Sequence, residues 1–223
     1  MPDTSVLVAY CHPGTVSGPF HESLLNTVTS HPELIVGHIG ITSGPRIASA
    51  RNKMVEAFLT HDREPEWLWM LDTDMVFPAD TLPRLLDVAD TLHPIVGGLC
   101  FGGRTDDIFP TLYRLVDPAE NEGRPIETIY NFPDDALVKV DATGAACLLI
   151  HRRVLENIYR SFPGPHHWFS ESVYNGMEFG EDWTFCLRAQ QMGHPIHVHT
   201  GIPIGHVKPR IIGINDFRAQ ADM

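Results

Sequence analysis

Positive charge is scarce in this sequence. The 223 residues carry 16 lysines and arginines against 28 aspartates and glutamates, a formal net charge of −12, and the first 45 residues contain neither lysine nor arginine. Binding nucleic acid through a broad surface that follows the phosphates requires clustered basic side chains, so the charge balance argues against that mode. An anionic ligand at the N-terminal segment would have to be held by backbone N–H groups, hydroxyls or imidazoles.

Long apolar stretches and paired cysteines are also missing. The sequence has no run of about 18 uncharged apolar residues and no signal-like N-terminus, so we expect a cytoplasmic protein that does not enter a membrane. The four cysteines lack CxxC spacing and stand among apolar neighbours. This pattern predicts reduced, buried thiols and neither a disulfide framework nor a zinc knuckle.

Apolar segments alternate with helical patterns through about the first 100 residues. Candidate strands lie at 5–10, 34–41, 67–71 and 95–100, with helical patterns between them. The second helix has a candidate cap at Ser43 and Pro45 in its first turn. This order predicts an α/β fold with a mostly parallel central sheet flanked by helices. The strand at 67–71 lacks polar alternation, so we expect it at the centre, covered on both faces.

The second half of the chain is less regular. It offers short strands at 111–116, 136–140, 145–150 and 196–200, and helices at 151–160 and 180–193, and the tail after Gly205 has the pattern of a loop. We expect these strands to extend the same sheet. The length suits one well-packed core and no linker is visible, so residues 1–223 are predicted to form a single domain.

Two aspartates, Asp72 and Asp74, follow the predicted central strand in the segment LWMLDTD. Open α/β sheets bind ligands at the carboxyl ends of their strands. In extended backbone these two side chains point the same way, and a divalent cation such as Mg²⁺ or Mn²⁺ relieves their repulsion most simply. The alternative is a strand end where the aspartates only cap a turn.

A second acidic pair, Glu181 and Asp182, begins a predicted helix after Gly180. The helix dipole favours acidic side chains in a first turn, which explains at least one of them without a function. The functional interpretation is that one carboxylate removes a proton from an incoming hydroxyl, a role worth typically about 10²- to 10⁴-fold in rate.

Histidines near the C-terminus are candidate metal ligands. His206 is a solitary imidazole, of a kind that is more often structural, but it could complete a cation site and would favour Mn²⁺ over Mg²⁺. His194, His197 and His199 form a competing cluster. Because no cysteine or acidic ligand stands near them, the pattern gives a zinc site little support.

Two loops are candidates for ligand binding, one after the strand at 95–100 and one after the helix at 151–160. Gly103 and Arg104 come after the strand at 95–100 and could let the backbone approach a sugar or phosphate, although an ordinary glycine turn would look the same. The aromatic segment 161–179 is long for a structureless connection, which is typical of lids and binding loops. Within it, Trp168 either stacks on a sugar face or packs onto the domain.

The segments LWMLDTDMVFPADTL, VDATGAACLLIHRRVLE, GEDWTFCLRAQQMG and IGHVKP, in this order, resemble GT-A-fold glycosyltransferases, especially small family-2-like bacterial and phage enzymes. The resemblance covers nearly the whole chain. It implies metal-dependent transfer of a sugar from a nucleotide-diphospho-sugar to an acceptor hydroxyl. Residues 1–104 would bind the nucleotide sugar and residues 105–223 the acceptor, which a glycan precursor, a protein or a modified DNA base would fit.

The same resemblance implies roles for individual residues. Asp74 would bind Mn²⁺ or Mg²⁺ together with His206, and Asp72 would touch the ribose or a metal-bound water. Asp182 would be the base of an inverting displacement, with Glu181 binding the acceptor or orienting the site. The positions expected to hold the nucleotide sugar are Tyr10, His12, Arg51, Gly103 and Arg104.

Two other functions stay open. A sugar-phosphate nucleotidyltransferase should carry a basic residue in a glycine-rich loop after the first strand, and CHPGTVSGPFHE has none. A non-catalytic metal- or carbohydrate-binding module would use Asp72 and Asp74 for a cation and Asp182 only as a helix cap. Retaining chemistry is open as well, because one fold supports both stereochemical outcomes.

Overall fold

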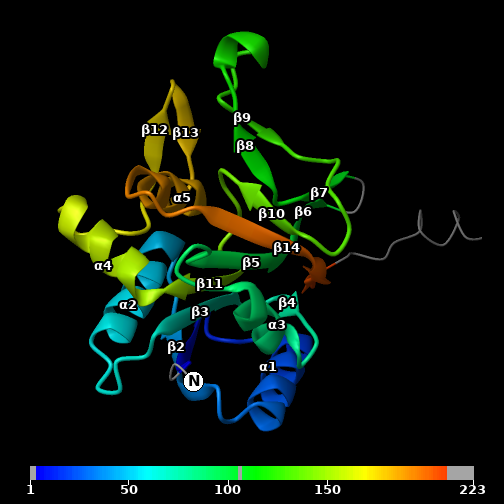
Figure 1. Ribbon diagram of the computed structural model, residues 1–223, viewed down its shortest axis with the longest axis vertical. Coiled ribbons are helices and arrows are strands. Elements are labelled where there is room, and N and C mark those ends of the chain that lie inside the picture. Colours follow the sequence, from blue (N-terminus) through cyan, green and yellow to red (C-terminus); the bar gives the residue numbers. More distant parts are fainter. Residues whose placement is uncertain (1–3, 105–106, 210–223) are drawn as a thin grey trace, which may run out of the picture.

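A seven-stranded sheet forms the centre of the molecule, with helices packed on both of its faces (Figure 1). The computed structural model describes residues 4–104 and 107–209. The strand order is β10-β14-β5-β11-β3-β1-β2. The strands of this sheet are β1 (Val6–His12), β2 (Ile35–Thr42), β3 (Trp67–Asp72), β5 (Ile95–Leu99), β10 (Leu137–Val140), β11 (Cys147–His151) and β14 (Ile196–Pro203).

Five of these strands run in one direction and two run against them. β1 is parallel to β2 and β3, and β14 is parallel to β5. β11 is antiparallel to both β3 and β5, and β10 is antiparallel to β14. The predicted α/β fold with a mostly parallel central sheet is therefore confirmed. The reversed strand β11 in the middle of the sheet is a feature that the alternation of strands and helices did not predict.

Helices cover the sheet in two layers, each with its own hydrophobic core. Apolar side chains of α2, α4 and α5 share one core, and those of α1 and α3 share the other. The helices are α1 (Gly18–Ser30), α2 (Ile47–Leu59), α3 (Thr81–Val88), α4 (Arg152–Ser161) and α5 (Glu181–Gln191).

The strand β3 lies between β1 and β11 and is buried along its length up to Leu71. Leu68 and Met70 pack into the core beneath α2, while Trp67 and Trp69 pack into the core beneath α3. Because both faces are covered, both sets of alternating side chains are apolar. The prediction of a central strand at 67–71 is confirmed, and this burial fixes the backbone that leads to Asp72.

The helix α2 begins later than the sequence suggested. Its N-cap is Arg46, which makes no side-chain capping hydrogen bond, so the predicted cap at Ser43 is wrong. The backbone N–H of Ser43 instead donates to the carbonyl of His12 at 2.8 Å, which continues the pairing of β1 with β2. Pro45 then disfavours helical backbone at the residue before it, so the chain stays extended past Ser43.

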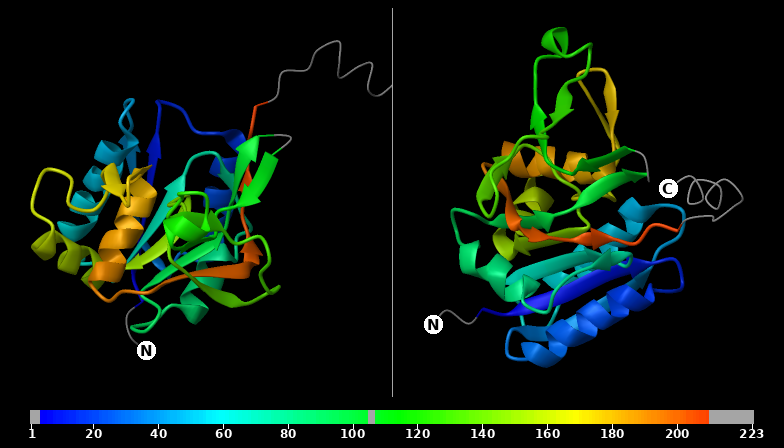
Figure 2. Two further views of the ribbon diagram at one scale, coloured as in Figure 1. Left: turned by 90° about the horizontal axis from the view of Figure 1, so that it is seen from above. Right: turned by 90° about the vertical axis from the view of Figure 1, so that its right-hand side faces the viewer.

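Four small ribbons surround the main sheet. The expectation that 111–116 extends the sheet is wrong, because β8 pairs with β9. The segment after Gly205 also differs from the expected loop, because β15 pairs with β4 directly after the aspartates. The ribbons are β4 (Met75–Val76) with β15 (Gly205–His206), β6 (Phe101–Arg104) with β7 (Asp107–Pro110), β8 (Tyr113–Leu115) with β9 (Ile126–Thr128), and β12 (Ser172–Tyr174) with β13 (Met177–Phe179). β8–β9 and β12–β13 stand next to each other at one end of the molecule (Figure 1 and Figure 2).

The cysteines behave as the sequence predicted. All four are free and buried, namely Cys11, Cys100, Cys147 and Cys186. Burial raises the pKa of the Cys186 thiol to about 12 and that of Cys147 to about 11, which keeps both as unreactive thiols. Within residues 4–104 and 107–209, no helix is long and apolar enough to cross a membrane.

Two adjacent glycines of β5 test how tightly the sheet packs against the segment leading to His206. A Cβ at Gly98 would lie 2.6 Å from the Ile204 side chain, whereas one at Gly97 would meet nothing closer than 3.3 Å. We expect Gly98→Ala to lower the free energy of unfolding by about 1–3 kcal/mol, as overpacking does, and Gly97→Ala to cost clearly less. Urea denaturation of both variants measures this. Equal costs would contradict the packing described here.

Candidate active site

The chain turns at the end of β3, and this turn separates the two aspartates. β3 ends at Asp72, Thr73 and Asp74 form the turn, and β4 begins at Met75. The extended backbone assumed for this pair is therefore absent. The two carboxylates have different partners, since Asp72 contacts Arg51 and Asp74 contacts His206.

Arg51 joins the two acidic pairs. Its side chain is only 2% exposed and reaches from α2 to the carboxyl end of β3. Nη2 donates to Asp72 at 3.0 and 3.2 Å, and Nη1 donates to Glu181 at 2.8 Å. Nη1 is also ion-paired with Asp182. One guanidinium thus binds three carboxylates, one from β3 and two from the first turn of α5.

The electrostatics of this cluster favour a charged Arg51. Burial lowers the pKa of its guanidinium, but the carboxylates of Asp72 and Glu181 outweigh that effect and raise the pKa above its usual value. Three carboxylates against one cation leave an excess of negative charge next to Asp74. The region is consequently suited to a further cation, and the positively charged end of α5 offsets part of the excess.

The aromatic segment 161–179 is anchored directly beside this cluster. Asn52, the residue after Arg51, donates to the carbonyl of Phe169 at 2.7 Å and accepts from the N–H of Trp168 at 3.2 Å. Trp168 is 1% exposed, and its indole donates to the carbonyl of Leu155. Of the two interpretations for Trp168, packing onto the domain is therefore correct, and stacking on a sugar is wrong.

His206 and Asp74 lie against each other because β15 pairs with β4. The ring nitrogen Nδ1 of His206 is 2.9 Å from the carbonyl oxygen of Phe101, which can only accept, so Nδ1 carries a hydrogen. Nε2 faces the Asp74 carboxylate, 2.9 Å from Oδ2. Metal-binding histidines commonly donate one ring N–H to a carbonyl and leave the other nitrogen for the metal, and Nδ1 of His206 makes such a contact.

This pair provides two donors for a cation, and the expected third does not turn toward it. Asp72 is held by Arg51. Among the residues that the structure describes, no group of three or more His, Cys, Asp or Glu side chains is arranged to hold a metal ion. The donor set of Asp74 and His206 fits a divalent cation that takes its remaining ligands from a bound substrate and water, as Mg²⁺ commonly does.

A cavity of about 550 Å³ opens beside the aspartates at the carboxyl ends of β1, β2 and β3. The loop after β1 closes onto the turn, since Ser17 donates its N–H to the carbonyl of Thr73. The described residues that line it include no lysine or arginine, so Arg51, which was expected to hold the nucleotide, is not part of this wall. They are Cys11, Pro13, Thr15, Val16, Ser17, Ser43, Gly44, Ile47, Asp72, Thr73 and Asp74.

A second cavity, of about 420 Å³, adjoins the first at Ile47, which lines both. Its wall includes Glu181, the basic side chain of Arg46, and His166 from the aromatic segment. Asp72 borders the first cavity and Glu181 the second, so the Arg51 cluster lies between the two. The arrangement can hold a ligand that spans both spaces.

The nucleotide-binding residues predicted on β1, Tyr10 and His12, make other contacts. Tyr10 packs edge-on against Phe20 with ring centroids 5.4 Å apart, and His12 accepts a hydrogen bond from the N–H of Gly14. Neither lines the 550 Å³ cavity. Their role toward a nucleotide stays a prediction. Cys11, between them, does line the cavity, and burial and the neighbouring Asp72 raise the pKa of its thiol.

Gly103 and Arg104 belong to the ribbon of β6 and β7. Gly103 has φ +98°, and a Cβ there would lie 1.7 Å from the carbonyl oxygen of Asp107. The tight ribbon therefore explains the glycine without a ligand. Arg104 ends β6, and its side chain lies outside the described part of the chain.

The competing histidine cluster does not converge. His194 is 3.0 Å from the Asn157 amide, His197 packs on the ring of His93, and His199 accepts from the N–H of Gly201. Burial lowers the pKa of both His194 and His197, which keeps them neutral in the core. These partners account for the histidines structurally, and no metal-binding group is found among them in the described residues.

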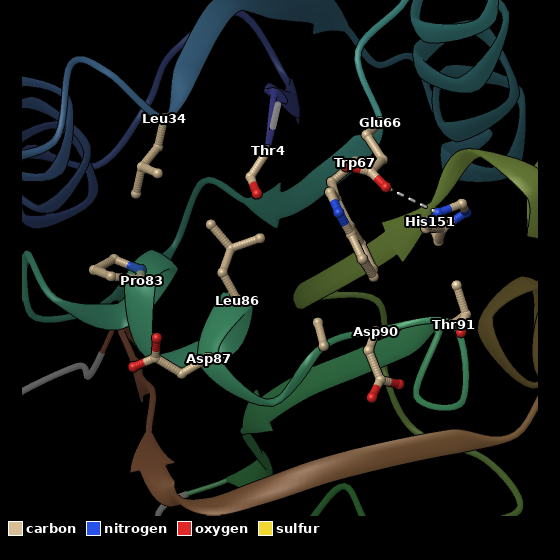
Figure 3. A pocket seen from close by; sticks show the side chains of 11 residues that line it. Thr4, Leu34, Glu66, Trp67, Pro83, Leu86, Asp87, Asp90, Thr91 and His151 are labelled. Carbon is tan, nitrogen blue, oxygen red and sulfur yellow. Dashed lines mark ion pairs between the residues drawn. The ribbon is translucent and has the colours of Figure 1, made fainter. Parts of the chain in front are cut away.

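Another cavity, of about 490 Å³, lies at the opposite ends of the strands (Figure 3). It is lined by Trp67, the first residue of β3, and by His151, the last of β11. Glu66 and His151 form an ion pair at its edge, 3.4 Å apart. No predicted site residue lines it, so we assign the candidate active site to the carboxyl end of β3.

Solved structures with a similar arrangement include glycosyltransferases. A viral protein from STIV matches 92% of this chain and 86% of its own, with a TM-score of 0.58 and 16% identity. The catalytic domain of Drosophila beta1,4-galactosyltransferase 7, solved with xylobiose, matches 97% and 79%, with a TM-score of 0.53 and 13% identity. GalNAc-T7, solved with UDP, GalNAc and Mn²⁺, matches 92% of this chain and 44% of its own, with a TM-score of 0.50 and 11% identity.

These likenesses establish the fold. The chain has a GT-A-like α/β fold, as the resemblance in sequence implied, and its structural neighbours include GT-A glycosyltransferases across most of its length. No protein-family model matches the sequence, and no curated protein is similar to it in sequence.

Removing the guanidinium of Arg51, which three carboxylates share, should destabilise the fold. In Arg51→Met three carboxylates lose their buried partner, and we expect the free energy of unfolding at pH 7 to fall by about 3–5 kcal/mol. The exposed Arg46→Met is the control, with a change within about 0.5 kcal/mol. Urea denaturation of both variants measures this, and equal costs for the two substitutions would contradict it.

Proposed function

We propose that this protein is a glycosyltransferase that moves a sugar from a nucleotide-diphospho-sugar to an acceptor hydroxyl. One observation carries the proposal: Arg51 connects the aspartate at the carboxyl end of β3 with the acidic pair that begins α5, between two adjoining cavities. Donor-binding and proton-accepting groups would thereby stand in one site. The GT-A-like fold that it shares with solved glycosyltransferases supports this interpretation.

The donor would occupy the 550 Å³ cavity. Its wall offers the hydroxyls of Thr15 and Ser43 beside Ser17, the N-cap of α1. Hydroxyl groups can donate hydrogen bonds to phosphate oxygens. Because no lysine or arginine lines this wall in the described part of the chain, the diphosphate would depend on these groups and on a cation.

Asp74 and His206 would hold that cation, Mn²⁺ or Mg²⁺. When bound, it would offset the charge that develops on the departing diphosphate. An imidazole ligand would favour Mn²⁺ over Mg²⁺. This use of manganese has a parallel in GalNAc-T7, which was solved with UDP, GalNAc and Mn²⁺. Asp72 would position Arg51 through their contact, or bind the ribose with the exposed part of its carboxylate.

Asp182 would be the base. Its Oδ1 is ion-paired with Arg51, while Oδ2 lies 3.8 Å from where a Cβ of Gly144 would stand. The acceptor hydroxyl would approach Oδ2, the oxygen that Arg51 does not bind. As the new bond from acceptor oxygen to anomeric carbon forms, the proton passes to Oδ2. The bond from anomeric carbon to phosphate oxygen breaks on the opposite side, and the nucleoside diphosphate leaves with its electron pair. This geometry gives inversion.

The alternatives have less support. A sugar-phosphate nucleotidyltransferase would want a basic side chain at the diphosphate, and the described cavity wall at the aspartates has none. A non-catalytic module would not require Glu181 and Asp182 to meet Asp72 through a buried arginine. Turnover decides between a transferase and a module, because only the transferase releases nucleoside diphosphate from a sugar nucleotide.

Cation binding should depend on the donor and on Asp74. With Mn²⁺ and a matching sugar nucleotide at about 100 times Kd, we expect stabilisation of about 2.7 kcal/mol, or about 5–10 °C in Tm. Mn²⁺ alone should give much less. A melting screen of UDP-, GDP-, dTDP- and CMP-sugars with and without Mn²⁺ measures this. Asp74→Asn should remove the Mn²⁺-dependent part, and an unchanged Mn²⁺ effect in that variant would disprove the assignment.

The base should be needed for turnover and not for donor binding. We expect Asp182→Asn to lower kcat for release of nucleoside diphosphate by about 10²- to 10⁴-fold while the donor-induced rise in Tm is kept. Asp62→Asn, which changes an exposed carboxylate remote from the site, should leave both unchanged. Full turnover in Asp182→Asn would rule out Asp182 as the base.

A further inference from the structure

A fourth cavity, of about 430 Å³, lies between the two ribbons β8–β9 and β12–β13 at the start of α5. Figure 1 and Figure 2 both show these ribbons side by side, with α5 beneath them. The volume is in the range of small-molecule sites. Its wall combines aromatic, polar and charged side chains, among them Tyr113, Asn121, Arg124, Glu127, Tyr130 and Trp183. We call this space the ribbon pocket.

The aromatic side chains of the ribbon pocket are held in place before any ligand binds. Trp183 packs edge-on against Tyr113 and against Phe179, with ring centroids 5.0 and 5.1 Å apart. Tyr113 is fixed by backbone hydrogen bonds to Ala142 and by its strand pairing with Thr128. Rings whose positions are already set lose little conformational entropy when a ligand stacks on them.

Polar groups next to these rings are available to a ligand. Among the described residues, the indole N–H of Trp183 has no hydrogen-bond partner. Burial raises the pKa of Tyr113 to about 12, so its phenol keeps its proton and can donate. Asn121 donates its amide hydrogens to two backbone carbonyls, which leaves its side-chain oxygen as an acceptor. Tyr130 is 69% exposed at the mouth of the pocket.

Aromatic faces bordered by single donors and acceptors match the surface of a sugar ring, which has apolar C–H faces and a rim of hydroxyls. The protein's net charge of −12 disfavours a nucleic acid here. Trp183, which lines the pocket, directly follows the proposed base Asp182 in α5. A Cβ at Gly144 would lie 3.8 Å from Oδ2 of Asp182 and 3.9 Å from Thr111, which stands two residues before Tyr113.

We propose that the ribbon pocket binds the acceptor as a saccharide, with its ring against Trp183 and Tyr130 and its reacting hydroxyl directed past Gly144 toward Asp182. This deepens the proposed function and rests on it, because it names the chemical class of the acceptor. The sugar of the acceptor is thus recognised by a wall separate from the one that would hold the donor.

Binding can be tested without turnover. Saturation-transfer NMR with cellobiose, maltose, xylobiose and N,N′-diacetylchitobiose as probes should detect at least one disaccharide on the full chain. Tyr130→Ala removes an exposed ring that supports little packing, and we expect binding of that disaccharide to weaken about tenfold or more. Trp183→Phe, which keeps a ring but loses the N–H, should weaken it less.

The matched control is Tyr159→Ala, an exposed tyrosine of α4 that does not line the ribbon pocket, and it should bind the disaccharide as the unaltered chain does. If none of the four disaccharides binds, or if Tyr130→Ala binds as well as the unaltered chain, the inference is overturned. Melting curves of each variant verify that it is folded.

The acceptor role has a separate readout. In the presence of Mn²⁺ and the stabilising sugar nucleotide, the disaccharide that binds should accelerate release of nucleoside diphosphate. Binding without acceleration would overturn the acceptor role. Absence of any release, with or without disaccharide, would instead overturn the proposed function, while the NMR result would still report whether the pocket binds saccharides.

Discussion

The contact between one buried guanidinium and three carboxylates determines how this site is put together. Arg51 reaches from α2 to Asp72 on β3 and to Glu181 and Asp182 on α5. The partners come from two separate parts of the sequence, the end of β3 and the start of α5, and the Arg51 charge, which is 2% exposed, would not be tolerated in the core without them. The arginine therefore fixes the distance between the aspartate beside the proposed donor cavity and the proposed base, and a shift of α2 would displace both together.

Much of the fold could be predicted because it depends on local pattern. The unbroken apolar run before Asp72 identifies a strand covered on both faces, and the helical spacing of Met54, Val55 and Phe58 identifies α2. The position of Arg51 in the sequence also indicates that this side chain is buried and paired. It stands four residues after Ile47 and three before Met54, on the buried stripe of that helix, where a charged side chain needs a partner.

The remaining features depend on contacts between distant segments. The direction of β11, the bend at Thr73 and the pairing of β15 with β4 are set by tertiary packing, and no nearby residue specifies them. The spacing of the aspartates did not predict the turn at Thr73 and Asp74, after which Asp72 and Asp74 have different partners. The partners of Arg51 could not be predicted from the sequence for the same reason, since 21 and 130 residues separate Arg51 from Asp72 and Glu181.

The ribbon of β4 and β15 has a consequence for how the protein is made. β4 directly follows Asp74, yet its partner is Gly205–His206, and the N–H of Val207 donates to the carbonyl of Asp74 at 2.8 Å. During synthesis on the ribosome, the sheet strands up to β11 can emerge and begin to pair while Asp74 still lacks its imidazole neighbour. The Asp74–His206 pair can form only after residue 207 has left the exit tunnel, so a prematurely ended chain would contain the aspartates without their histidine.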